Sequence, residues 1–177
     1  EAGFSVLAYD QRGHGASVNA PDGTPRDPRG LTPEEWAAFP EDASAALGWL
    51  ATRAAPPRAV VLGGSSVGSS AALVAGAQAT EVHVAGIFAL SPGRRYRGID
   101  AVAPLARYEG PVLAVAAELE AAAVDMLGAI DRVAEGAETR VVEGASAHGL
   151  RLLREDPTLL PRLVAFTRAA AEGAPRE

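Results

Sequence analysis

The stretch that most constrains this chain is a short apolar run followed at once by glycines, serines and an Ala-rich helical pattern. Residues 59–70 read AVVLGGSSVGSS, so a G-x-S-x-G pattern extends from Gly64 to Gly68. In a nucleophile elbow, such a turn joins a strand to a helix so sharply that its central serine projects from the sheet. Cβ atoms at the flanking glycines would collide with the neighbouring strand and helix. The pattern therefore predicts a nucleophilic hydroxyl at Ser66 and an oxyanion-binding N–H on Val67, at the start of the helix.

The rest of the chain alternates strand-like apolar runs with patterns of helical spacing. The expected strands cover residues 4–9, 59–63, 84–90, 111–117 and 139–142. The expected helices start at residues 32–35 and 40, follow the elbow to about residue 79, and cover 121–134 and 157–171. Continuous apolar strands that alternate with helices imply a parallel sheet with helices on both faces. We therefore predict one α/β domain over residues 1–177, with a mostly parallel sheet of about five strands.

Composition limits the classes of partner. The chain has 177 residues, a formal net charge of −6 and no cysteine. Its acidity argues against binding to nucleic acid or to an anionic membrane surface, and the lack of cysteine excludes disulfides and thiolate ligands. No apolar run is long enough to span a bilayer. We expect a small-molecule substrate and no metal or cofactor, while the oligomeric state stays open. The cytoplasm is slightly favoured, with a removed leader as the alternative because the chain starts with Glu1.

An acid and then a histidine follow Ser66 along the chain, as candidates for a catalytic site. His148 lies in a loop of small residues, GASAHG at 144–149, directly after the last expected strand. Glu120 follows the strand expected at 111–117, and Asp125 lies on the next helix. The order serine, acid, histidine is that of the α/β-hydrolase triad, in which histidine is the base and the acid orients it. Glu120 is the first candidate for the acid, and Asp125 is the alternative.

Several segments together resemble the α/β-hydrolases, in particular the small cap-less kind related to dienelactone hydrolases and simple esterases. The matching segments are YDQRGHGAS at 9–17, the elbow at 64–68, ALSPG at 89–93, PVLAV at 111–115 and SAHG at 146–149. The resemblance runs over essentially the whole chain. It implies a serine hydrolase that transfers an acyl group to water through Ser66, His148 and Glu120. The expected substrates are small esters, thioesters, lactones or a peptide bond, because too few residues separate the strands at 84–90 and 111–117 for a cap domain.

The chain departs from the family pattern at two places. Position 120 is Glu where the family would have Asp, so Asp125 and Asp100 are kept as further candidates for the acid. The chain also starts at what resembles the family's fourth strand, so the first three strands and the loop that donates the second oxyanion N–H have no counterpart. Either the strand expected at 4–9 pairs directly with the strand at 59–63, or the chain is an N-terminally truncated fragment, which is the interpretation that we favour. Such a chain would be a poor catalyst, since loss of one oxyanion donor costs about 3–4 kcal/mol.

Other functional interpretations compete with catalysis. A non-catalytic binding module could keep the same scaffold, because fold does not dictate function. An inactive fragment of a hydrolase is a second alternative. A nucleotide-binding domain is a distant third, since residues 63–68 lack the lysine of a P-loop and the spacing of G-x-G-x-x-G.

The remaining charged and aromatic residues have simpler interpretations. Arg94 and Arg95 follow the third expected strand and could form a carboxylate-binding rim, although a run of charges is usually a solvated face. Asp10, Arg12 and His14 are expected to tie down the long loop at 10–32 by hydrogen bonds and caps. Trp36 and Trp49 are expected in the core or at the edge of a lid.

Overall fold

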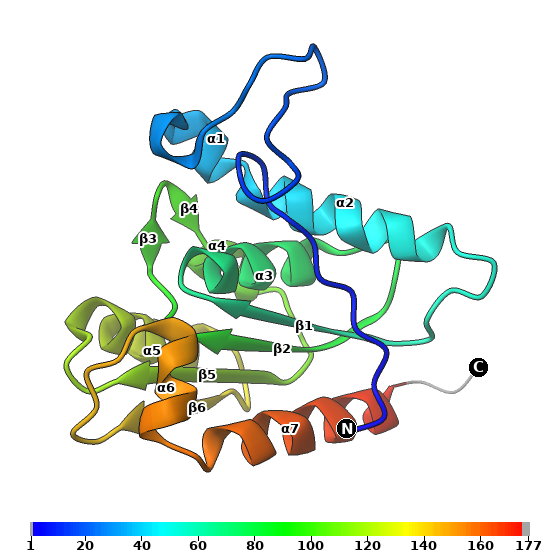
Figure 1. Cartoon of the computed structure of the whole chain (residues 1–177). Coiled ribbons are helices and arrows are strands. Elements are labelled where there is room, and N and C mark those ends of the chain that lie inside the picture. The colour runs from blue at the N-terminus through cyan, green and yellow to red at the C-terminus, as the bar shows by residue number, and fades with distance from the viewer. Residues whose placement is uncertain (1, 175–177) are drawn as a thin grey trace.

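The structure, a computed structural model, describes residues 2–174 and is built on a parallel sheet of four strands (Figure 1). The order in the sheet is β1-β2-β5-β6, and all three neighbouring pairs are parallel. The strands are β1 (Val60–Ser65), β2 (Val84–Leu90), β5 (Val112–Ala117) and β6 (Glu138–Val142). Because the strands are parallel, their carboxyl ends meet at one edge of the sheet, where the segments that follow them converge.

Helices connect the strands and close the chain. They are α1 (Pro33–Ala37), α2 (Phe39–Ala51), α3 (Val67–Gln78), α4 (Val102–Leu105), α5 (Ala121–Val133), α6 (Leu152–Glu155) and α7 (Leu159–Gly173). Short 3₁₀ turns lie at Pro28–Gly30 and Gly149–Arg151, and a small antiparallel pair joins β3 (Arg95–Tyr96) to β4 (Ile99–Asp100). The break expected near Pro40 occurs at Ala38, between α1 and α2. None of the helices in the part of the chain that the structure describes is long and apolar enough to cross a membrane.

The sheet is buried on both faces, as an α/β fold requires. Along β5, Ala114 and Ala116 point into a core that contains Met126 and Ile130 of α5 together with residues of α2, α3 and α4. The intervening Val115 packs in a second core with α6 and α7. Figure 1 shows α2 and α3 above the sheet and α7 below it. This two-sided burial confirms the predicted fold class and explains why β5 reads as an unbroken apolar run.

The strand expected at residues 4–9 is wrong. These residues form no strand in the structure, and Val6 is 83% exposed. A strand needs a neighbour for its backbone N–H and C=O groups. Within the described residues, β1 pairs only with β2, and its other edge does not pair with residues 4–9. The apolar run at 4–9 therefore gives no strand here, and the main sheet has four strands instead of five.

The long loop after residue 9 is held by charged hydrogen bonds, as its sequence suggested. The Arg12 guanidinium binds both carboxylate oxygens of Asp42 on α2, and the Arg12 backbone N–H donates to the same carboxylate at 2.9 Å. Asp10 accepts a hydrogen bond from the Ala16 N–H at 2.9 Å. Bidentate arginine–carboxylate contacts are among the strong polar interactions of proteins. These contacts place the loop against the start of α2.

The aromatic residues near this loop divide between packed and exposed positions. His14 bonds a backbone carbonyl of its own loop through Nδ1 and packs edge-on against Trp36 and Phe39. This geometry confirms a structural position for His14. Trp36 is partly buried in the same cluster, whereas Trp49 on α2 is 50% exposed, which excludes the core position among the two expected for it.

Candidate functional site

Ser66 occupies the sharp turn between β1 and α3 that the sequence predicted. Its backbone has φ 58° and ψ −127°, a region that non-glycine residues rarely adopt and that proteins tend to keep at functional sites. The turn is possible because Gly64 has no side chain. A Cβ there would lie 2.2 Å from the Gly68 carbonyl oxygen. The elbow thus depends on Gly64, two residues before the serine.

His148 reaches Ser66 from the far end of the chain. Its Nε2 lies 2.7 Å from the Ser66 Oγ, although 82 residues separate the two. The loop that carries His148 follows β6 and passes close to the elbow, where the Leu150 N–H donates to the Ser65 Oγ at 3.1 Å. Gly149 is required at this approach, because its φ is 62° and a Cβ would lie 2.3 Å from the Ser65 Oγ. The loop therefore brings the imidazole to the serine through a glycine that no other residue replaces without strain.

Glu120 completes a line of three side chains. It lies between β5 and α5, and its Oε1 binds the His148 Nδ1. Its other oxygen, Oε2, accepts the Ser91 hydroxyl at 2.6 Å and the Ala117 N–H at 3.2 Å. The Glu120 side chain is 14% exposed and that of His148 55% exposed. The carboxylate is thus shielded and held from several sides, while the imidazole lies open to solvent.

The chemistry of these groups sets the direction of the hydrogen bonds. An ionised carboxylate only accepts, so the proton between Glu120 and His148 belongs to Nδ1 of the imidazole. Nε2 of the neutral ring is then an acceptor, and the Ser66 hydroxyl donates to it. This arrangement has an imidazole nitrogen against the serine hydroxyl and a carboxylate behind the imidazole, which is the geometry of a Ser-His-acid triad.

Backbone N–H groups hold the histidine loop at further points. Glu118 accepts the Gly144 N–H at 2.7 Å, where the loop begins. Glu155 on α6 accepts the N–H groups of Ser146 and Ala147 at 2.9 and 3.0 Å, immediately before His148. These side chains anchor the loop through its backbone and leave the imidazole free to face Ser66.

The other acids considered from the sequence do not lie beside His148. Asp125 is paired with Arg94 at 3.6 Å, and Asp100 is paired with Arg95 at 3.3 Å. Both arginine side chains are exposed, and each pairs with its carboxylate at the protein surface. The structure therefore brings Glu120 to the histidine and places Asp125 and Asp100 elsewhere.

Val67 is the first residue of α3, directly after Ser66. The first N–H groups of a helix have no partner within the helix, and the helix dipole adds positive potential there. The Val67 N–H therefore has the position expected of an oxyanion donor. Among residues 2–174, no three His, Asp or Glu side chains group in a way that could hold a metal ion.

The Ser66 site lies at the carboxyl edge of the sheet. Between β2 and β5, the described chain forms only β3, β4 and the short α4.

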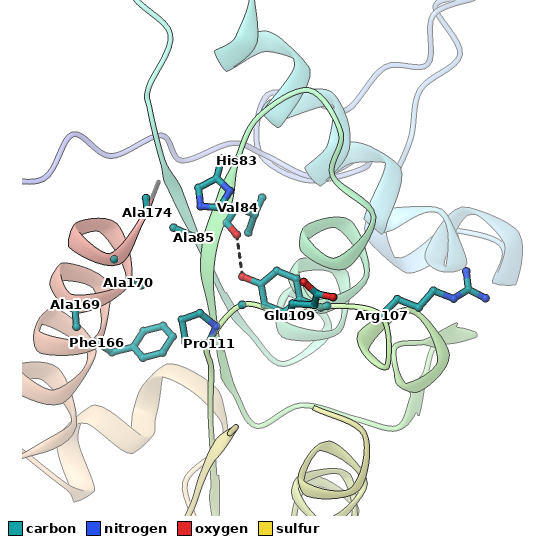
Figure 2. Close-up of a pocket in the computed structure, with 13 residues that line it drawn as sticks. His83, Val84, Ala85, Arg107, Glu109, Pro111, Phe166, Ala169, Ala170 and Ala174 are labelled. Carbon is teal, nitrogen blue, oxygen red and sulfur yellow. Dashed lines mark hydrogen bonds between the residues drawn. The ribbon is translucent and has the colours of Figure 1, made fainter. Parts of the chain in front are cut away.

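A hollow of about 680 Å³ lies at the opposite edge of the sheet, between α7 and the starts of β2 and β5 (Figure 2). His83, Tyr108 and Phe166 are among its lining residues, and none of the three aligned side chains is. His83 itself is exposed. This hollow is therefore separate from the Ser66 site.

With this geometry described, the chain can be compared with known proteins. Residues 1–140 match the family model described as serine aminopeptidase, S33. The chain belongs to this α/β-hydrolase family. The matched residues include the elbow and Glu120. They end before His148, which lies in the loop after β6 of this chain. No curated relative matches the chain.

Solved structures support the same fold for this S33 family member. A dienelactone hydrolase from Anabaena variabilis is 21% identical, with a TM-score of 0.60 over 81% of this chain and 61% of that one. The α/β hydrolase GrgF from Penicillium is 15% identical, with a TM-score of 0.69 over 93% and 79% of the two chains. An esterase from Pyrococcus furiosus is 15% identical, with a TM-score of 0.60 over 76% and 62%. The chain spans less than two thirds of the dienelactone hydrolase and the Pyrococcus esterase.

The predictions from sequence do not include the side chains that surround Ser66, His148 and Glu120. Ser91, directly after β2, appears there only within the matching segment at 89–93, and Ser65, Glu118 and Glu155 have no predicted role. One signal was available for Ser91. A polar residue directly after a buried parallel strand lies at the same edge of the sheet as the elbow. For Glu155 no such signal exists, because its contact depends on how α6 packs against the loop.

Proposed function

We propose that this chain is a serine hydrolase that cleaves a small ester, thioester, lactone or similar acyl bond. The proposal rests on one observation: the hydrogen-bonded line from Ser66 through His148 to Glu120, with a strained serine at its head. In this mechanism Ser66 is the nucleophile, His148 the general base and Glu120 the acid that orients the imidazole.

The reaction has two halves. Ser66 Oγ attacks the substrate carbonyl while His148 Nε2 takes the hydroxyl proton, and the carbonyl oxygen becomes an oxyanion that the Val67 N–H stabilises. His148 then returns the proton to the leaving group as its bond to the acyl carbon breaks. Water attacks the acyl-enzyme with His148 again as base, and the acid product leaves with Ser66 restored. A positioned base of this kind contributes about 10²–10⁴-fold to the rate.

The substrate class follows from the surroundings of the site. The His148 side chain is largely open to solvent, and the segment between β2 and β5 is too short for a cap domain. An open site suits small, soluble substrates and gives little burial for long acyl chains. The family description adds an amide of a peptide N-terminus as a substrate to be tested beside the esters.

The test is hydrolysis of four small substrates: 4-nitrophenyl acetate, an acyl thioester, a lactone and an aminoacyl 4-nitroanilide. We expect at least one to be turned over by the wild-type chain and by Ser70→Ala, a control that removes a buried hydroxyl of α3 bonded to Gly93. Ser66→Ala should abolish that turnover. Equal rates for wild type and Ser66→Ala on every substrate would overturn the proposal and favour a binding module on the same scaffold.

A further inference from the structure

A second strained serine lies beside the acid. Ser91 directly follows β2, has φ 51° and is 3% exposed. Its N–H donates to the Val115 carbonyl at 2.7 Å, which continues the pairing with β5 beyond the last residue of β2. A non-glycine residue held at positive φ and fully buried persists only where the surroundings favour it. The positive φ of the buried Ser91 therefore needs an explanation in its contacts, besides the turn itself.

The Ser91 hydroxyl joins two parts of the Ser66 site. It donates to the Glu120 Oε2 at 2.6 Å and accepts the Gly149 N–H at 2.8 Å. Neither bond can reverse, because a carboxylate cannot donate and an N–H cannot accept. A continuous series of hydrogen bonds thus runs from the Gly149 N–H through the Ser91 hydroxyl to Oε2 of Glu120, the carboxylate oxygen that does not bind the imidazole.

We propose that Ser91 is a positioning residue, which fixes Glu120 and the histidine loop relative to one another so that Oε1 faces the His148 Nδ1. The expected effect on turnover rests on the proposed function of Ser66, whereas the contacts of Ser91 with Glu120 and Gly149 do not depend on it. Ala117 N–H alone would hold Oε2 from one side, at a longer 3.2 Å. The Ser91 hydroxyl holds it from a second strand, and because it also binds Gly149, a shift of the loop and a rotation of the carboxylate become coupled.

Two measurements on Ser91→Ala test this role. The first is the proton NMR resonance of the His148 Nδ1–H, expected downfield of the amide signals in the wild type and broadened or lost in the variant. The second is turnover of whichever small substrate the wild type hydrolyses. We expect kcat to fall about 10-fold with KM unchanged, the size associated with loss of one hydrogen bond to a charged group. In a Glu120→Ala background the same substitution should have no further effect on kcat.

Control variants separate this role from a loss of stability. Ser70→Ala also removes one buried hydroxyl, so it should lower the thermal midpoint to a similar extent but leave the NMR resonance and kcat unchanged. Ser91→Gly removes the hydroxyl while it relieves the positive φ, and it serves if Ser91→Ala does not fold.

An Nδ1–H resonance and a kcat that match the wild type in Ser91→Ala, or in Ser91→Gly where Ser91→Ala does not fold, would overturn the inference. Failure of the proposed function would look different, because the NMR resonance reports the contact between Glu120 and His148 even in a chain with no turnover.

Discussion

Replacing Glu120 with glutamine tests which group donates in each hydrogen bond of the Ser66 site. The carboxylate offers one oxygen to the His148 Nδ1–H and the other to the Ala117 N–H and the Ser91 hydroxyl. An amide of the same shape offers one oxygen and one NH₂ group. The Ala117 N–H is a fixed backbone donor, so the amide oxygen turns toward it. The NH₂ group then faces His148 and donates to Nδ1.

That exchange reverses the tautomer of the imidazole. With Nδ1 accepting, the ring proton moves to Nε2, which lies 2.7 Å from the Ser66 Oγ and can no longer take the serine proton. In serine proteases the equivalent acid-to-amide change lowers kcat by about 10⁴-fold, because the wrong tautomer faces the nucleophile. We expect a fall of similar size in Glu120→Gln, equivalent to about 5 kcal/mol of transition-state stabilisation, with KM little changed.

The assay is steady-state turnover of the small substrate that the wild type hydrolyses, together with ¹⁵N NMR of the imidazole to read its tautomer. Glu118→Gln is the matched control. It changes an acid two residues away that accepts the Gly144 N–H and has no contact with His148. Its kcat should stay close to the wild-type value. A Glu120→Gln variant within about threefold of wild type, with Nδ1 still protonated, would refute the reasoning.

Three other results follow from contacts outside the line of three. Gly64→Ala should destabilise the fold by about 3 kcal/mol or more in urea unfolding, since its Cβ would lie 2.2 Å from the Gly68 oxygen; an unchanged midpoint would contradict this. Arg12→Ala should cost about 1–3 kcal/mol by the same measurement, because it leaves the Asp42 carboxylate without its bidentate partner; a loss below about 0.5 kcal/mol would count against that contact. Burial raises the pKa of Tyr108 from 10.0 to about 12. The unfolded chain then loses this proton first, so stability should fall as pH rises from 10 to 12, and a Tyr108→Phe variant with an equal fall would contradict the assignment.

The fold and the main site residues were accessible from the sequence for a physical reason. In a parallel sheet the residues that follow each strand meet at one edge, so a serine at an elbow, an acid after one strand and a histidine after another converge. The resemblance to the α/β-hydrolases places the acid at position 120, in the turn between β5 and α5, and this favoured Glu120 over Asp125. Asp125 lies one turn into α5, where the structure pairs it with Arg94.

The parts that could not be predicted depend on neighbours that local pattern does not reveal. Residues 4–9 form an apolar run like that of a buried strand, but whether they pair depends on which backbone lies beside them. Trp49 is a large aromatic residue within a helix, yet half of its surface is exposed. The contacts of Ser91 and Glu155 arise from the packing of separate elements and need coordinates to be seen.

The most direct test of the account is covalent labelling of the chain by a fluorophosphonate, followed by mass spectrometry of the peptides. A serine activated by a neighbouring base attacks the phosphorus and expels fluoride, which leaves a stable adduct on its oxygen. The account predicts one adduct, on Ser66, that disappears in Ser66→Ala and forms far more slowly in His148→Ala. Labelling of Ser66 at the same rate in His148→Ala, or no adduct on Ser66, would contradict it.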